Sequence, residues 1–193
     1  MLPSFTADGL LPPGDYPLTL AELRTSMLVE GPTGWADGGF WDAAWRRELV
    51  DNLAMLVEQL WRVGIDRIFI DGSFVEDKPR PNDIDGYFEC DVMALATGEL
   101  EHRLNALDPY HVWTWDPAAR RWDADSGKAQ LPMWLRYHVE LYPHFGQPSG
   151  ICDRYGHELQ FPSAFRQRRL TFQPKGIVQI VKPEERSLPP LAP

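Results

Sequence analysis

The chain has 193 residues, of which 44% are hydrophobic and 12% aromatic, and this is enough for one domain with a sizeable apolar core. Its formal net charge of −9 disfavours broad, non-specific attraction to nucleic acid, which depends on Lys and Arg neutralising phosphates. No stretch approaches the roughly 20 apolar residues of a membrane-spanning helix, and no charged segment followed by an apolar run opens the chain. We therefore expect a cytoplasmic protein with no membrane partner.

The first third of the chain predicts two helices. The N-terminal lead, 1–34, is expected to be irregular except for a short helix over 18–28, which the capping-box pattern of Thr19 and Glu22 indicates. Apolar residues then recur at helical spacing from 41 to 63. This spacing predicts an amphipathic helix that packs on a sheet.

A pair of strands should follow this helix. Residues 67–70 are β-branched or aromatic and end at a Gly-Ser pair, so they predict a short strand. A proline-broken loop then leads to a second predicted strand over 83–88. Thr97 is expected to cap a helix over 97–107, whose leucines share one face.

The next segment predicts a hairpin and a third strand. Residues 113–122 are split by an Asp-Pro-Ala-Ala turn signal, and we interpret them as a tryptophan-rich hairpin insertion. Residues 135–142 alternate between apolar and polar side chains, which predicts a strand. Glu140 and His138 lie on the polar face of that strand.

The remainder, 143–193, is interpreted as a C-terminal elaboration. It contains a helical piece near 163–169 and an apolar segment over 176–181 that predicts a strand, before a proline-rich end. No repeat or low-complexity linker divides the chain. We therefore expect a single domain, 1–193, with its core at about 40–142.

Two carboxylates, Asp83 and Asp85, open the second predicted strand, which follows the Gly72-Ser73 turn after nine intervening residues. Alternate residues of a strand point the same way, so both carboxylates face one side while Ile84 enters the core. A glycine lets the backbone approach a ligand closely, and a serine adds a hydroxyl and an amide for a phosphate oxygen. This arrangement can hold a divalent cation beside a phosphate, the alternative being a solvated strand edge.

The succession of strand, Gly-Ser turn, loop and Asp-x-Asp strand resembles the signature of the nucleotidyltransferase superfamily, the DNA polymerase beta-like group. The resemblance covers residues 40–142, and it is closest to small bacterial members with a Gly-Ser-Phe-Val turn and to the minimal nucleotidyltransferases of toxin–antitoxin pairs. It implies an α/β (α+β) fold in which a mixed sheet is flanked by helices. The predicted helix-strand-strand-helix order matches that core.

The resemblance also implies site residues for a magnesium-dependent enzyme that uses two Mg²⁺ ions and a nucleoside triphosphate. Asp83 and Asp85 would be the first two metal ligands. Glu140 would be the third, on a neighbouring strand, where it helps to activate the acceptor hydroxyl. Gly72 and Ser73 would hold the triphosphate. Glu replaces the commoner Asp at the third position, and the alternative is that Glu140 lies on a solvated face.

Other polar residues near the motif are secondary candidates. Lys78 and Arg80 can reach triphosphate oxygens from the loop, or remain exposed loop cations. His138 can contact a metal or phosphate from the face of Glu140, although a hydrogen-bonded structural role is commoner for such a histidine. Asp71, next to the Gly-Ser turn, is a further ligand or a turn residue, and we favour the turn residue. The densest basic run is interpreted as a solvated helix face and comprises Arg166, Arg168, Arg169 and Lys175.

The leading hypothesis is transfer of a nucleoside monophosphate from a triphosphate to a hydroxyl of a protein, an RNA end or a small molecule, for instance within a toxin–antitoxin or defence system. The alternative is a catalytically inactive member that binds a small helical partner protein through its tryptophan-rich insertion. Glu140 discriminates between them, because two ligands alone disfavour catalysis. A third possibility, a metal-dependent hydrolase on another fold, is disfavoured by the Gly-Ser turn.

Overall fold

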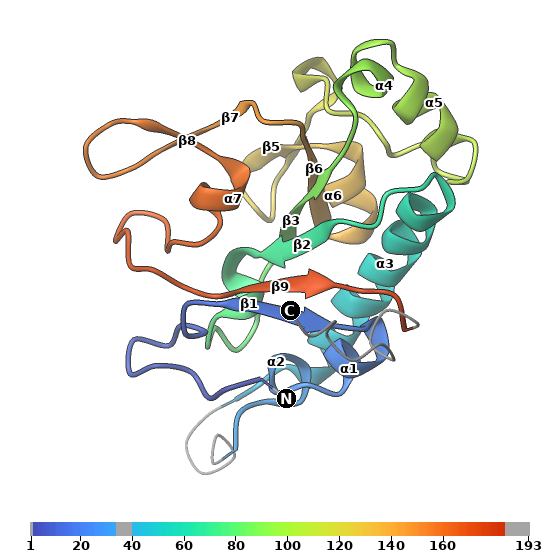
Figure 1. The fold of residues 1–193 in the computed structure, drawn as a ribbon. Helices are drawn as coiled ribbons and strands as arrows, with labels where there is room; N and C mark the ends of the chain where they lie inside the picture. The colour runs from blue at the N-terminus through green and yellow to red at the C-terminus, as the bar shows by residue number, and fades with distance from the viewer. Residues whose placement is uncertain (1, 34–39, 184–193) are drawn as a thin grey trace, which may run out of the picture.

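The computed structural model describes residues 2–33 and 40–183, and within them the chain forms a mixed α/β fold (Figure 1). The main sheet consists of the strands β1 (Asp15–Leu18), β2 (Ile68–Asp71), β3 (Ile84–Glu89), β6 (Val139–His144) and β9 (Ile177–Ile180). Their order is β1-β9-β2-β3-β6. The pairs β1–β9 and β3–β6 are parallel, whereas β2 is antiparallel to both of its neighbours. The expected mixed sheet is confirmed.

One face of this sheet is covered by helix α3 (Ala43–Arg62), close to the helix that the sequence predicts. The helix begins where the Asp42 carboxylate accepts a hydrogen bond from the amide of Trp45. Its leucines recur at helical spacing and pack against branched side chains of β2, β3, β6 and β9 to form the main core. Each such side chain contributes roughly 1.5–3 kcal/mol when fully buried. The apolar face of the sheet is therefore the face that packs against α3.

The opposite face is partly covered by the short helix α7 (Phe161–Ala164) and a hairpin of β7 (Pro148–Cys152) and β8 (Glu158–Gln160). A second apolar cluster forms there, built from Phe69, Tyr87, Phe161, Ala164, Phe165 and Ile177. Figure 1 shows α7 and α3 on opposite sides of the central strands. The helical piece expected near 163–169 is thus wrong in position, because the helix ends before the basic run.

The N-terminal lead differs from the prediction in two ways. It contains two helices, α1 (Leu20–Arg24) and α2 (Met27–Glu30), instead of one over 18–28. The capping box of Thr19 is confirmed, but the Ser26 hydroxyl accepts a hydrogen bond from the Leu28 amide and starts a new helix. The lead also supplies strand β1, and β9 confirms the strand predicted over 176–181. The sheet therefore extends beyond 40–142 at both ends of the sequence.

The helix predicted over 97–107 is confirmed within shorter bounds, 99–105, with Leu100 and Leu104 buried on one face, and a further helix precedes it. Helix α4 (Val92–Ala96) begins at Asp91, whose carboxylate accepts hydrogen bonds from two amides of the first turn. Thr97 ends this helix instead of capping the next one, and Gly98, in a left-handed conformation with φ of 75°, separates it from α5 (Glu99–Asn105). Only the expected cap is wrong, because Thr97 is the C-cap of α4 and Gly98 is the N-cap of α5.

The third strand begins later than the alternation suggests. Helix α6 (Pro132–Tyr137) occupies the first part of the predicted strand and ends at His138, which has a left-handed φ of 51°. The left-handed residue turns the chain into β6, so the strand starts at Val139. Glu140 therefore lies in a strand next to β3, as expected, whereas His138 does not.

The first part of the tryptophan-rich stretch, which contains Trp113 and Trp115, packs on the core and does not form the expected hairpin. The hairpin lies further along the chain, where β4 (Arg121–Asp123) pairs with β5 (Lys128–Gln130) after a 3₁₀ turn, η3 (Pro117–Ala119). Trp113 is fully buried, and its indole N–H donates to Gln59 at 2.5 Å. The Trp115 indole donates to the Leu141 carbonyl at 2.8 Å. These tryptophans pack under the sheet because their N–H groups find partners there.

Arg46 is a fully buried residue of α3 that joins three segments of the chain. Its guanidinium donates hydrogen bonds to the carbonyls of Leu28 (2.6 Å), Phe74 (2.8 Å), Glu76 (3.3 Å) and Lys78 (2.5 Å). Burial lowers the pKa of Arg46 to about 9, which leaves it charged at neutral pH. Arg46 thus holds the loop that precedes β3 against α2 and α3.

Replacing Arg46 should destabilise the fold strongly, because four carbonyls lose a charged donor. We expect Arg46→Met to lower the free energy of unfolding by about 3 kcal/mol, measured by urea denaturation. The neighbouring Arg47, which pairs with Glu30 at the surface, provides the control, and Arg47→Met should leave the denaturation midpoint unchanged. Equal losses in the two variants would contradict the role given to Arg46.

Candidate active site

Three carboxylates lie in one row across neighbouring strands. In the antiparallel pair of β2 and β3, Asp71 is opposite Asp85, and in the parallel pair of β3 and β6, Asp85 is opposite Glu140. Side chains at one register position of a sheet project to the same face, so the three carboxylates share the face away from α3. All three line a cavity of about 870 Å³.

The predicted partner of Asp85 lies beside this row. Asp83 immediately precedes β3, lines the same cavity and is half-buried. Its Oδ2 accepts a hydrogen bond from the indole N–H of Trp134 at 2.7 Å. The structure therefore brings Asp83, Asp85 and Glu140 together, as the sequence predicts, and adds Asp71 as a fourth carboxylate.

The Gly-Ser turn meets the row at close range. Gly72 begins a 3₁₀ turn, η2 (Gly72–Val75), and both Gly72 and Ser73 line the cavity. A Cβ atom at Gly72 would lie 2.3 Å from the Asp85 Oδ2, and the φ of +71° is left-handed. Glycine is therefore required here both by the backbone conformation and by the approach of the carboxylate.

The two ends of the row have positively charged neighbours. The Lys175 Nζ lies 3.1 Å from Oδ1 of Asp71, and Arg120 lies 3.6 Å from Oε1 of Glu140. The Tyr142 hydroxyl also donates to Oε2 of Glu140 at 2.5 Å. Within residues 2–33 and 40–183, no hydrogen bond or ion pair reaches the carboxylate of Asp85. Negative charge is thus least compensated at the centre of the row.

The burial and proximity of these carboxylates raise the pKa values of Asp85 and Asp71. Burial raises the pKa of Asp85, and the negative charges of Asp83, Glu140 and Asp71 raise it further. Burial also raises the pKa of Asp71 to about 7, against the opposing effect of the Lys175 ammonium. A divalent cation at the centre of the row would relieve both the burial of charge and the mutual repulsion.

The donor set suits a hard cation such as Mg²⁺, which prefers carboxylate and phosphate oxygens to an all-protein cage. Oε1 of Glu140 is buried and accepts no hydrogen bond from the described residues, so a lone pair remains available. In that part of the chain, no three acidic, His or Cys side chains are already grouped tightly enough to enclose a metal. The arrangement fits a metal that shares its coordination with a bound phosphate.

The secondary candidates Lys78, Arg80 and His138 differ in whether they line the carboxylate cavity. Lys78 is exposed at the margin of the cavity, whereas Arg80 lies outside it, ion-paired with Asp42 and stacked 4.6 Å from the ring of Trp45. His138 does not share the face of Glu140. Its ring packs instead against Trp45 and Trp134, at centroid distances of 5.1 and 4.6 Å.

The basic run predicted as a solvated helix face is neither helical nor uniformly solvated. Arg166 pairs with Asp15, and Arg168 pairs with Glu76 at 3.1 Å. Lys175 is 3% exposed and lies under the Gly-Ser turn. Sequence reasoning missed Lys175, Arg120 and Tyr142 as neighbours of the carboxylates, because tertiary packing brings them there and no local motif marks them.

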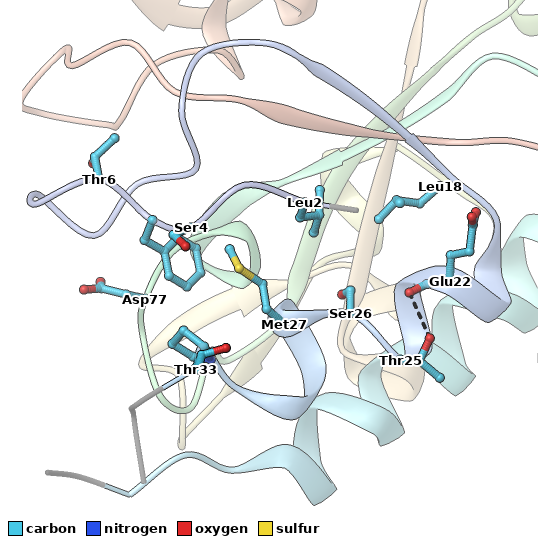
Figure 2. A pocket seen from close by; sticks show the side chains of 12 residues that line it. Leu2, Ser4, Thr6, Leu18, Glu22, Thr25, Ser26, Met27, Thr33 and Asp77 are labelled. Carbon is cyan, nitrogen blue, oxygen red and sulfur yellow. Dashed lines mark hydrogen bonds between the residues drawn. The ribbon is translucent and has the colours of Figure 1, made fainter. Parts of the chain in front are cut away.

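A second cavity, of about 750 Å³, lies between the N-terminal segment and the helices α1 and α2 (Figure 2). Leu2, Ser4 and Met27 line it, and Asp77 reaches it from the loop before β3. This cavity contains none of the predicted site residues. The carboxylate cavity is therefore the candidate active site.

The raised pKa values predict how the stability of the metal-free protein depends on pH. Between the ordinary aspartate pKa of 3.8 and about 7, folded Asp71 keeps a proton that the unfolded chain releases. With a chelator present, the free energy of unfolding should therefore rise as the pH falls from about 8 to about 5.

The variant Asp85→Asn should be more stable than the wild type at about pH 8 and should show a shallower pH dependence, because it removes a buried like charge. Glu58→Gln, on the exposed face of α3, should retain the wild-type dependence. Chemical denaturation at several pH values measures both effects. A stability that increases from about pH 5 to about pH 8 would contradict this account of the row.

Among the described residues, no helix is long and apolar enough to cross a bilayer. No curated protein and no solved structure matches the sequence. One family model, described as a family of unknown function (DUF6932), matches residues 3–181, which is most of the chain. The chain therefore belongs to the DUF6932 family.

Proposed function

We propose that the protein is a magnesium-dependent nucleotidyltransferase that moves a nucleoside monophosphate from a nucleoside triphosphate to a hydroxyl group. The observation that carries this proposal is the in-register row of Asp85 and Glu140, with Asp83 beside it and the Gly72-Ser73 turn at its edge. Phosphoryl transfer needs oxygen ligands for a hard cation and, beside them, groups that hold a phosphate. The carboxylates and the Gly72-Ser73 turn would supply these two parts.

The chain's residues would divide the work as follows. Asp83, Asp85 and Glu140 would hold Mg²⁺, which neutralises charge on the phosphate oxygens and lowers the pKa of a bound hydroxyl. Gly72 and Ser73 would hold the triphosphate, with Lys78 at the margin. Oε1 of Glu140, which accepts no hydrogen bond from the described residues and lies 3.6 Å from Arg120, would receive the proton of the acceptor hydroxyl.

The transfer step forms a bond between the acceptor oxygen and the α-phosphorus and breaks the bond from that phosphorus to the bridging oxygen. Pyrophosphate leaves with the electron pair of the broken bond, and the acceptor proton passes to a carboxylate. The cavity of about 870 Å³ lies within the usual range of about 300–1,000 Å³ for small-molecule sites, and this volume supports a ligand of nucleotide size. A protein, an RNA end or a small molecule can supply the hydroxyl.

The inactive, partner-binding alternative has less support. Glu140 lies beside Asp85, so a third carboxylate is available as a candidate ligand. Trp113 is fully buried, and Trp115 packs against the core, which leaves Trp122 as the exposed tryptophan of the stretch proposed to bind a partner. A cytoplasmic location, where nucleoside triphosphates and Mg²⁺ are abundant, and a toxin–antitoxin or defence role with a small helical partner belong to the proposal.

The test is transfer of label from each of the four α-³²P nucleoside triphosphates, with Mg²⁺, to the protein itself or to components of a cell lysate. We expect labelled product with the wild type and a loss of at least about 100-fold in the Asp83→Asn/Asp85→Asn variant. Removal of Mg²⁺ by a chelator should have the same effect. The nature of the labelled product then identifies the acceptor class.

A matched control neutralises two carboxylates elsewhere. Glu48 and Glu58 are exposed on the outer face of α3, so Glu48→Gln/Glu58→Gln should transfer label at the wild-type rate. Label transfer that persists in a folded Asp83→Asn/Asp85→Asn variant would overturn the proposal. Absence of both label transfer and triphosphate binding in the folded wild type would overturn it as well.

A further inference from the structure

Lys175 reaches the candidate active site from the segment just before β9, far from the motif in sequence. Its ammonium lies 2.8 Å from Oε1 of Glu76 and 3.1 Å from Oδ1 of Asp71, and it donates a hydrogen bond to the Gly72 carbonyl at 3.1 Å. The side chain is 3% exposed. One buried cation thus contacts the end of β2, the first residue of the turn and the loop that follows it.

These contacts match what an ammonium group needs when it is buried. A lysine has three donors and no acceptor, and burying its charge is costly unless partners satisfy it. Here Asp71, Gly72 and Glu76 supply three oxygen acceptors, two of them charged. Removing one partner of a buried ion pair costs much more stability than replacing both partners. A paired substitution can therefore separate the effect of Lys175 on binding from its effect on stability.

The contacts of Lys175 also determine how the negative charge of the neighbouring carboxylates is compensated. Lys175 offsets the charge of Asp71, which is directly opposite Asp85 in the sheet. Asp83 and Asp85 form no ion pair within the part of the chain that the structure describes. Cation binding is therefore favoured at Asp83 and Asp85, and disfavoured at Asp71.

We propose that Lys175 is a positioning residue for phosphate binding, which fixes the Gly72-Ser73 turn and keeps Asp71 out of the metal's ligand set. This inference rests on the proposed function, because it assigns the phosphate to that turn. Glu76 extends the link, since it also pairs with Arg168 at 3.1 Å. The segment from Arg168 to Lys175 is thereby part of the site, although it lies outside the motif-bearing core.

The experiment measures binding of inorganic tripolyphosphate with Mg²⁺, a probe that needs no knowledge of the base, by isothermal titration calorimetry. The variant Asp71→Asn/Lys175→Met removes both charges of the buried pair and should keep its melting temperature close to that of the wild type. We expect its affinity for tripolyphosphate to fall about tenfold. Asp71→Asn alone, which leaves Lys175 on Gly72 and Glu76, should bind nearly as well as the wild type.

Lys182→Met is the matched control, because Lys182 pairs with Asp66 at 2.5 Å beyond the far end of β9. It should bind tripolyphosphate like the wild type. Wild-type affinity in the folded double variant would overturn the role of Lys175 and leave the proposed function standing, whereas a wild type that binds no tripolyphosphate would overturn both. If the double variant does not fold, Lys175→Arg decides: its planar donors cannot meet the same three acceptors, so unchanged affinity would overturn the inference.

Discussion

The register of β3 between β2 and β6 is the constraint on which the rest of the structure depends. Because side chains alternate along a strand, a slip of one residue would turn Asp85 into the leucines of α3 and bring Ile84 to the cavity. The apolar face prevents such a slip, since Ile84 and Phe88 are fully buried against the core. Packing on one face of the sheet therefore positions the carboxylates on the other.

The same row of carboxylates destabilises the folded protein but provides the ligands of the proposed site. Four carboxylates in and around one cavity repel one another, and burial makes their charges more costly. Lys175 and Arg120 offset this charge at the two ends, whereas Asp85 at the centre forms no ion pair with any of the described residues. A site of this kind is destabilising when empty and favourable when a cation and an anionic substrate enter together.

Much of the sheet and of the motif could be predicted because the signals are local. Period-two alternation, the Gly-Ser pair and the spacing to Asp83 are readable from the sequence, and the structure places Asp83, Asp85 and Glu140 in one cavity. Failures occurred where a single residue redirected the chain. Asp91 starts an additional helix, α4, which ends at Thr97, and His138 turns a helix into a strand. The alternation upstream of His138 was read as strand because helix and strand periods are hard to separate over a few residues.

Contacts between distant segments could not be predicted from local patterns at all. Lys175 was interpreted as one of a run of solvated basic residues. It is buried because it just precedes β9, which lies inside the sheet. Strand β9 pairs with β1 so that Asp15 is opposite Ile177, which joins nearly the first and nearly the last described segments. Pairings of such long sequence separation are slow to form because the intervening chain must be ordered first. During synthesis, the motif-bearing strands emerge well before β9, so a nascent chain carries the aspartates before it carries Lys175, the lysine that supports their turn. The carboxylate cavity can therefore reach its folded arrangement only after the segment that contains Lys175 and β9 has been synthesised.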